Sequence, residues 1–328
     1  MTKIIKIDPA NIDMELLSEA ACVIKHGGLV AFPTETVYGL GADSFNENAV
    51  KNIYVAKGRP SDNPLISHIA DISELEIFAR EIPDAALKLA HEFWGGPLTM
   101  ILKKRNNIPD AVTAGLDTVA VRLPSHSIAN ALIRLAKTPI AAPSANLSGS
   151  PSPTTARHCI DDLNGRVDMI VDGGNSMIGI ESTVVDLSTP IPVILRPGMI
   201  SPEDMAAVIG EVQYGGENVG APKCPGMKYK HYSPNAEVYI MHDISKADGF
   251  TDEYTCVIAK NADKYKFAAK TVFDAGEDDA QYAARLFYLL RTADEAGAKK
   301  ILAQMPENRG IGIALLNRLY KSAGGKVI

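Results

Sequence analysis

One pattern constrains the fold of this chain most: short apolar runs, each closed by Gly, Pro or small polar residues, alternate with stretches of helical periodicity. The clearest run is residues 28–32, bounded by glycine and proline, which is typical of a buried strand. A threonine-rich turn with two glycines follows over residues 33–41. This alternation predicts an α/β fold, and in open α/β sheets ligands bind where strands end.

Two cations follow the next helical stretch. Residues 47–56 have a helical apolar face, and Lys57 and Arg59 come directly after it, separated by Gly58 and followed by Pro60. One interpretation is an anion-binding loop. The other is an ordinary charged turn, because a cation at the C-terminal end of a helix also suits the helix dipole.

Three further strand-like runs carry polar residues. His68 lies in the run 65–70, where the alternatives are a hydrogen-bonded core histidine and a ligand-binding one. Arg122 lies in the apolar run 119–124, where a buried charge needs either an ion-pair partner or the carboxylate or phosphate of a substrate. The run from 139 ends in a turn of small residues, which lets a ligand approach the backbone closely.

Composition excludes several classes of protein. The 328 residues carry a net charge of -6, which argues against a surface coated for nucleic acid. The four cysteines form no CxxC pair, which disfavours a zinc site or a disulfide scaffold. The N-terminus does not resemble a secretory signal, and no apolar run approaches the roughly 20 residues that span a bilayer. We therefore expect a cytoplasmic protein with no membrane partner.

The composition changes near residue 213. We expect a catalytic domain over residues 1–212 and a linker over 213–235 that is rich in Gly, Pro, Lys and Tyr. A smaller α/β domain over 236–328 follows, with strands near 237–241, 255–259 and 300–305 and helices near 279–295 and 312–323. Nothing in this last domain names a ligand, since Gly310 and Gly312 do not complete a dinucleotide fingerprint.

The sequence predicts electrostatic rather than covalent catalysis. The sequence has no P-loop, HExxH, GxSxG or kinase signature and no evident covalent nucleophile. If the predicted strands share one sheet, their ends can line a cleft for a polyanion, where the protein positions reactants and neutralises phosphate charge. The residues concerned are Lys57, Arg59, His68, Arg122 and Arg196, with Thr36, Asn63, Ser144 and Ser182. An RNA-binding module would use the same cations, and a carbamoyl or phosphoryl transferase with another acceptor is a third interpretation.

Six motifs in order resemble the YrdC-like family, in particular the long, two-domain threonylcarbamoyl-AMP synthases. They are PTETVYGLG (33–41), KGRPSDNPL (57–65), VAVRLP (119–124), APSANLSG (142–149), STVVDL (182–187) and LRPG (195–198). KYKHYSP (228–234) and the C-terminal α/β domain are similar to the long form. The resemblance implies a YrdC-like twisted open α/β sheet with a ligand cleft, plus a smaller Rossmann-like C-terminal domain.

The resemblance also implies a reaction. L-threonine and bicarbonate give N-carboxythreonine, whose carboxylate attacks the α-phosphate of ATP, so that threonylcarbamoyl-AMP forms and pyrophosphate leaves. Mg²⁺ is expected with ATP. Other proteins then transfer the threonylcarbamoyl group to adenosine 37 of tRNAs that read ANN codons. The expected partners are therefore this transferase machinery and tRNA itself.

The resemblance assigns roles residue by residue. The threonine-binding positions are Thr36, His68, Arg122, Ala142 and Ser182. The ATP-binding positions are Arg59, Asn63, Thr118, Ser144, Ser152, Arg196 and Tyr232. Lys57 and Arg59 are expected to act electrostatically in catalysis, and no protein side chain is expected to ligate a metal. The linker 213–235 is expected to close over the site as a lid, because carbamates are labile in water.

Overall fold

The computed structural model describes residues 1–215, 231–265, 267, 269 and 271–328. It divides into two compact units. The large unit takes in residues 1–148 and 153–176 and the described chain from 181 to 215. The small unit takes in 149–152, 177–180 and the described chain from 231 onward. The middle of the predicted linker, 216–230, lies outside the described residues, so the lid stays a prediction.

A mixed 11-stranded sheet forms the centre of the large unit, within the described residues. Its strand order is β1-β8-β2-β3-β7-β4-β6-β5-β9-β10-β11. The strands are β1 (Lys3–Lys6), β2 (Val30–Phe32), β3 (Gly39–Asp43), β4 (Ile66–His68), β5 (Leu98–Lys103), β6 (Thr118–Arg122), β7 (Ile140–Ala142), β8 (Met169–Asp172), β9 (Thr183–Asp186), β10 (Val193–Arg196) and β11 (Gln213–Tyr214). The helices are α1 (Met14–Lys25), α2 (Glu47–Lys57), α3 (Leu75–Phe78), α4 (Asp84–Phe93), α5 (Asp110–Thr113), α6 (Ser127–Ala136), α7 (Ala156–Leu163) and α8 (Pro202–Ile209).

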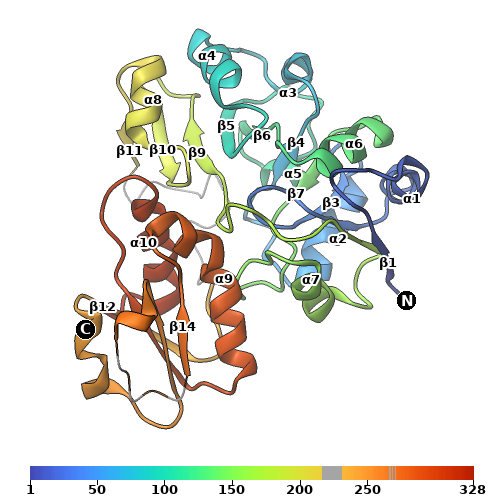
Figure 1. The fold of residues 1–328 in the computed structure, drawn as a ribbon. Helices are drawn as coiled ribbons and strands as arrows, with labels where there is room; N and C mark the ends of the chain where they lie inside the picture. The colour runs from blue at the N-terminus through green and yellow to red at the C-terminus, as the bar shows by residue number, and fades with distance from the viewer. Residues whose placement is uncertain (216–230, 266, 268, 270) are drawn as a thin grey trace. The chain divides into compact units, whose positions relative to one another are not determined.

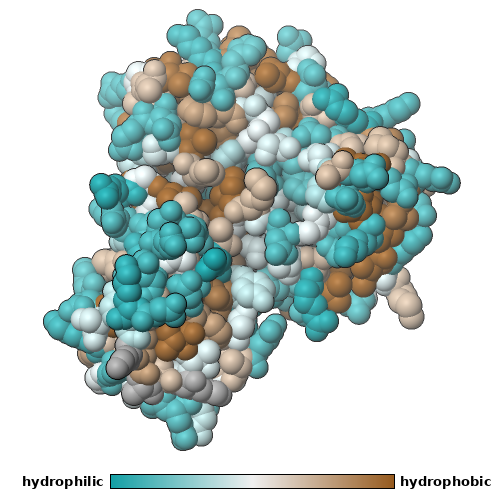
Figure 2. Space-filling model, viewed as in Figure 1, coloured by the Kyte–Doolittle hydropathy of each residue, from teal (hydrophilic) through white to brown (hydrophobic). Residues whose placement is uncertain are grey.

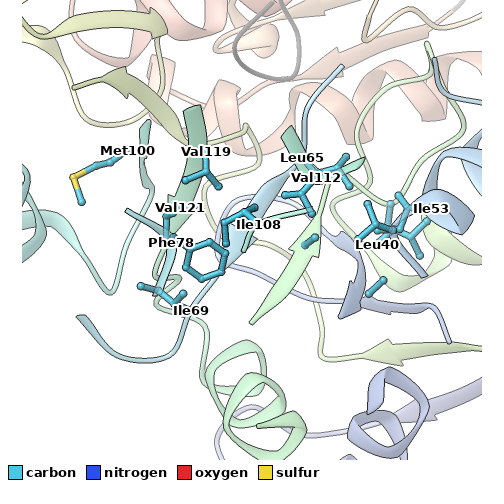
Figure 3. Close-up of a cluster of buried hydrophobic side chains, with 14 of the residues drawn as sticks. Leu40, Ile53, Leu65, Ile69, Phe78, Met100, Ile108, Val112, Val119 and Val121 are labelled. Atoms are coloured by element: carbon cyan, nitrogen blue, oxygen red, sulfur yellow. The ribbon is translucent and has the colours of Figure 1, made fainter. Parts of the chain in front are cut away.

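One face of this sheet carries the main hydrophobic core. Side chains of α2, α3, α4, α5, α7 and α8 pack there against alternate residues of the strands, including Met100, Val119 and Val121. Figure 3 shows part of this cluster, with Phe78 beside Val121 and Ile69. Because successive strand residues point to opposite faces, the residues between them point to the other side of the sheet.

Helices α1 and α6 cover part of that other face. They lie side by side (Figure 1) and pack over β1, β2, β7 and β8 in a second apolar cluster. Further along the same face is a small cluster made of strand residues, Ile66, Ile101, Ala120 and Val184. This cluster lies on the same face as His68 and Arg122, because Ile66 and Ala120 are two residues before them on β4 and β6, and we call it the floor of the site.

The sequence interpretation missed strand β3, because Gly39 and Gly41 made it look like a turn. Both glycines lie in the sheet, where β3 pairs antiparallel with β2 and β7. A Cβ atom at Gly41 would lie 2.5 Å from Ile140 Cγ2 and 2.8 Å from Phe32 Cε1. Glycine is therefore required here by close packing, which sequence periodicity does not report.

Helix α2 forms as predicted and places the two cations. Asn46 caps its first turn by accepting a hydrogen bond from the backbone N–H of Ala49. Gly58 ends the helix in the left-handed conformation, at φ 62°. The chain therefore turns sharply between Lys57 and Arg59, and the two side chains leave the backbone on either side of that turn.

The described part of the small unit has a parallel four-stranded sheet in the order β12-β15-β13-β14. Its elements are β12 (Glu237–Met241), β13 (Thr255–Ala259), β14 (Thr271–Asp274), β15 (Lys300–Gln304), α9 (Asp279–Glu295) and α10 (Ile311–Ala323). All five expected elements match within one residue at each end, whereas β14 was missed. The predicted fold class, an α/β sheet unit followed by a smaller α/β unit, is confirmed.

The outer surface is mixed in character. Figure 2 shows hydrophilic residues around smaller apolar areas on the face in view. In the described parts of the chain, no helix has the length and apolar character needed to cross a membrane.

Candidate active site

Strand register brings two of the predicted residues, His68 and Arg122, together on one face of the large sheet. His68 of β4 pairs with Arg122 of β6 and with Ile140 of β7. Arg122 pairs in turn with Thr99 of β5. Paired residues share a face, so His68, Arg122 and Thr99 point to the same side as the floor cluster.

Arg122 is buried and makes three hydrogen bonds. Its Nη2 lies 2.6 Å from Oε1 of Glu35, and both side chains are about 5% exposed. Its Nη1 donates to Thr36 Oγ1 at 2.9 Å, and its Nε donates to the Gly96 carbonyl at 3.4 Å. A guanidinium has five N–H groups, so two remain to meet a ligand carboxylate. The ion-pair and substrate interpretations of Arg122 are thus compatible.

Glu35 is a charged partner of the site. Burial alone would raise the pKa of its carboxyl, but the charge and hydrogen bond of Arg122 together hold that pKa below its usual value. The second carboxylate oxygen, Oε2, is buried and has no hydrogen-bond partner in the described chain. A buried charged oxygen of this kind is stabilised by a donor, which a ligand can supply.

His68 is neutral. Burial, and after it the nearby charge of Arg122, lower the pKa of His68 to about 3. Its Nδ1 lies 3.1 Å from the Ile66 carbonyl and 3.3 Å from the Ile140 carbonyl. A carbonyl only accepts, so Nδ1 carries the proton and Nε2 keeps its lone pair. His68 can therefore accept a hydrogen bond from an amine or carbamate N–H.

Ser182 and Arg196 are in direct contact. Arg196 donates from Nη2 to Ser182 Oγ and from Nε to the Ser182 carbonyl, each at 3.0 Å. Ser182 Oγ also lies 2.8 Å from Thr99 Oγ1. The residue predicted to bind ATP and the residue predicted to bind threonine are thus linked by two hydrogen bonds.

Lys57 holds the small-residue turn after β7. Its ammonium donates to the Ser144 carbonyl at 2.5 Å, to the Asn146 carbonyl, and to Asn146 Oδ1 at 3.4 Å. Ser144 Oγ donates to the same Oδ1 at 2.5 Å. Lys57 is 2% exposed and is also the last residue of α2, where a cation suits the helix dipole, so both interpretations stay open. Its predicted electrostatic role in catalysis stays a prediction.

Arg59, Asn63 and Thr118 lie toward the opposite ends of the same strands. Arg59 Nη2 donates to the Asn63 carbonyl at 3.2 Å. Asn63 is 1% exposed, and its side-chain oxygen has no hydrogen-bond partner among the described residues. The chain runs from Asn63 into β4, whose first residue Ile66 pairs with Ala120. Thr118 is therefore at the same end of the sheet as Asn63.

The sequence predicts that the candidate residues lie at strand ends that line one cleft. In the structure they do not all lie at one edge of the sheet. Strand β7 runs antiparallel to β4, so Ala142 pairs with Ile66 rather than with His68. Ser144 then continues beside Gly39 through an antiparallel bridge. The large-unit residues are spread along one face of short strands, with His68 and Arg122 toward one end and Thr118 and Ala142 toward the other.

Ser152 and Tyr232 belong to the small unit. Tyr232 has φ 63°, is 5% exposed, and its ring stacks on Phe287 with centroids 5.2 Å apart. Its carbonyl accepts a hydrogen bond from Ser322 Oγ at 2.5 Å. The predicted nucleotide contacts of both residues stay predictions.

Sequence reasoning assigned no role to Glu35 or Thr99. Glu35 lies within the motif of residues 33–41. Its position directly before Thr36 was the only sequence feature that could have indicated a role in the site. Thr99 stood inside the apolar run 98–102, where one hydroxyl gave little reason for attention. Only the folded chain shows that Glu35 contacts Arg122 and that Thr99 contacts Ser182.

Comparison with known proteins identifies the family. A family model described as "Telomere recombination", which covers Sua5, YciO and YrdC, matches residues 22–198, and one described as "Threonylcarbamoyl-AMP synthase, C-terminal domain" matches residues 200–324. The chain belongs to the Sua5/YrdC family of threonylcarbamoyl-AMP synthases. The predicted family and enzyme class, a nucleotidyltransferase, are thereby confirmed.

Relatives extend over the whole chain of this synthase-family member. The threonylcarbamoyl-AMP synthase of Pyrococcus abyssi is 48% identical, over 94% of both chains. That of Bacillus subtilis is 47% identical, over 95% of this chain and 94% of its own. The crystal structure of P. abyssi Sua5 complexed with L-threonine matches with a TM-score of 0.96 and 45% identity, covering 100% of this chain and 99% of that one.

Proposed function

We propose that this chain is an L-threonylcarbamoyladenylate synthase, which makes threonylcarbamoyl-AMP and pyrophosphate from L-threonine, bicarbonate and ATP. One observation carries the proposal: neutral His68 is paired on the sheet with buried Arg122, which contacts Glu35 and the Thr36 hydroxyl. The Ser182 hydroxyl, in turn, accepts a hydrogen bond from Arg196. The threonine complex of the P. abyssi relative supports the choice of amino acid.

The charged and polar groups around Arg122 complement those of an amino acid. Arg122 can meet the α-carboxylate with its remaining N–H groups, while Thr36 and Ser182 offer hydroxyls beside it. Neutral His68 offers an acceptor for the amino or carbamate N–H. The Arg122–Glu35 pair is neutral overall, so a zwitterion enters without leaving a net buried charge.

The chemistry requires no covalent intermediate with the protein. The amine of threonine attacks the bicarbonate carbon, and water is lost to give N-carboxythreonine. A carbamate oxygen then forms a bond to the α-phosphorus of ATP, the bond between that phosphorus and the α,β-bridging oxygen breaks, and pyrophosphate leaves. Arg59 and Arg196 are proposed to neutralise charge on the phosphates, which lowers the barrier to attack by an anion.

The turn held by Lys57 is proposed to shape the nucleotide site. Ser144 and Asn146 follow β7 directly, and the hydrogen bonds from Lys57 to their carbonyls fix the backbone of this turn. Asn63, Thr118, Ser152 and Tyr232 complete the proposed ATP contacts, and Ala142 contributes backbone for threonine. These assignments rest on the family resemblance.

Magnesium is proposed to enter with ATP as part of the substrate. In the described parts of the chain, no group of three or more His, Cys, Asp and Glu side chains could hold a metal ion. Mg²⁺ is commonly bound through substrate phosphates with few protein ligands. The phosphates are therefore the proposed ligands. The product would pass to a threonylcarbamoyl transferase that acts on adenosine 37 of ANN-decoding tRNA.

Pyrophosphate release tests the proposal. Threonine, bicarbonate and ATP are supplied together and then omitted one at a time, and release should require all three. Release without threonine, or equal release with other amino acids, would contradict it. RNA binding with a steep salt dependence and no pyrophosphate would instead favour the RNA-binding module.

A further inference from the structure

The hydroxyl of Ser182 lies in a small buried network with Thr99 and Arg196. Thr99 Oγ1 is 2.8 Å and Arg196 Nη2 is 3.0 Å from Ser182 Oγ. Thr99 is fully buried and Ser182 is 1% exposed, so bulk water is not available to either hydroxyl. The partners of the two hydroxyl hydrogens must come from the protein or from a ligand.

Counting donors shows that the network is incomplete without a ligand. Arginine only donates, so Arg196 occupies one lone pair of Ser182 Oγ. Thr99 and Ser182 have one hydroxyl hydrogen each, and only one of the two can lie between their oxygens. Among the described residues, neither hydroxyl has a further acceptor. One hydrogen therefore lacks an acceptor, and it is favourable for a ligand to provide one.

The arrangement that serves an acidic ligand is the one in which Thr99 donates to Ser182. Arg196 and Thr99 then fill both lone pairs of Ser182 Oγ, and the Ser182 hydrogen is left for the ligand. Register places Thr99 between Arg122 of β6 and Val184 of β9, beside the residue proposed to hold the carboxylate. A carboxylate held by Arg122 accepts hydrogen bonds only, and it matches this single donor.

We propose that Thr99 is a positioning residue that directs the Ser182 hydroxyl hydrogen toward the carboxylate of the bound amino acid. The inference rests on the proposed function, which it deepens by adding a positioning residue that acts on the substrate only through Ser182. It also explains why a threonine occupies the second position of β5, within the apolar run 98–102.

Kinetics of Thr99→Val test this, because valine keeps the shape of threonine and lacks the hydroxyl. We expect KM for threonine to rise about tenfold, which corresponds to one hydrogen bond of about 1.4 kcal/mol. kcat and KM for ATP should change less than about twofold, since Arg196 keeps its bonds to Ser182. Thr99→Ser, the matched control, keeps the hydroxyl and should stay within about twofold of the wild type in every constant.

Several results would overturn the assignment. An unchanged KM for threonine in Thr99→Val would do so, as would an equal rise in Thr99→Val and Thr99→Ser, which would indicate packing alone. A fall in kcat at constant KM would also count against it. If Thr99→Val does not fold, Thr99→Ala carries the same expectation. A wild-type enzyme that releases no threonine-dependent pyrophosphate would instead overturn the proposed function, and the role of Thr99 with it.

Discussion

His68 and Arg122 occupy directly paired positions on the neighbouring parallel strands β4 and β6. Each is buried, and the charge of Arg122 acts on the imidazole at close range. The pair places a permanent cation beside a histidine that stays neutral. Arg122 can therefore donate to a carboxylate, while His68 can accept a hydrogen bond from an N–H group.

The neutral state of His68 predicts a pH dependence of stability. Its pKa is about 3 in the folded chain and about 6.5 when unfolded, so the unfolded state takes up the proton first as pH falls. The stabilisation is fully present above pH about 6.5 and is lost as pH falls toward about 3. Between pH about 7 and about 5.5, the wild type should lose about 1 kcal/mol that His68→Gln does not lose.

Urea unfolding followed by Trp94 fluorescence measures this difference. Trp94 is the only tryptophan in the sequence and lies in the large unit, so it reports on the unit that contains His68. Equal pH dependence in the two proteins would contradict the depressed pKa.

The buried pair of Glu35 and Arg122 predicts non-additive stability. Glu35→Gln or Arg122→Met alone leaves one charge buried without its partner, and each should destabilise the large unit by about 3 kcal/mol. The double variant removes both charges and should lose less than the sum of the single losses. Urea unfolding followed by Trp94 fluorescence gives the free energies of unfolding of the two single variants and the double variant. A loss in the double variant equal to the sum of the single losses would argue against the pair.

The contacts of Lys57 predict a specific defect in ATP use. Lys57→Met removes the hydrogen bonds that hold Ser144 and Asn146, so KM for ATP should rise at least about tenfold. Lys51→Met is a matched control, because Lys51 lies on the same helix, is exposed, and forms a surface ion pair with Glu47 in the i,i+4 position. An unchanged KM for ATP in Lys57→Met would contradict the proposal that the turn at Ser144 and Asn146 shapes the nucleotide site.

The close packing of Gly41 predicts a large effect from one added methyl group. Gly41→Ala places a Cβ atom against the fully buried side chains of Ile140 and Phe32, which should destabilise the protein by about 2 to 3 kcal/mol. Gly249→Ala is the control, because a Cβ atom there has no neighbour within 4 Å. Calorimetry should show a lower melting temperature only for Gly41→Ala, and equal melting of both variants would contradict the packing argument.

Local patterns in the sequence determined much of the secondary structure. The Asn46 cap, the apolar face of α2 and Gly58 are signals carried by neighbouring residues, and the helix forms where they indicate. The strands at 237–241 and 255–259 and the helix at 279–295 follow from periodicity in the same way. The order of six motifs was enough to indicate the family, whereas Gly39 and Gly41 hid β3 because their reason lies in distant neighbours.

Only the tertiary structure decided which side chains meet. Register, a long-range property, pairs His68 with Arg122 and brings Thr99 to Ser182, more than 80 positions apart in the chain. The antiparallel direction of β7 moved Ala142 away from the end that strand order alone suggested. The charge state of His68 and the partner of Arg122 likewise depend on burial and contact. A sequence states which chemical groups are present, but the free energy of a buried group depends on neighbours that only the folded chain supplies.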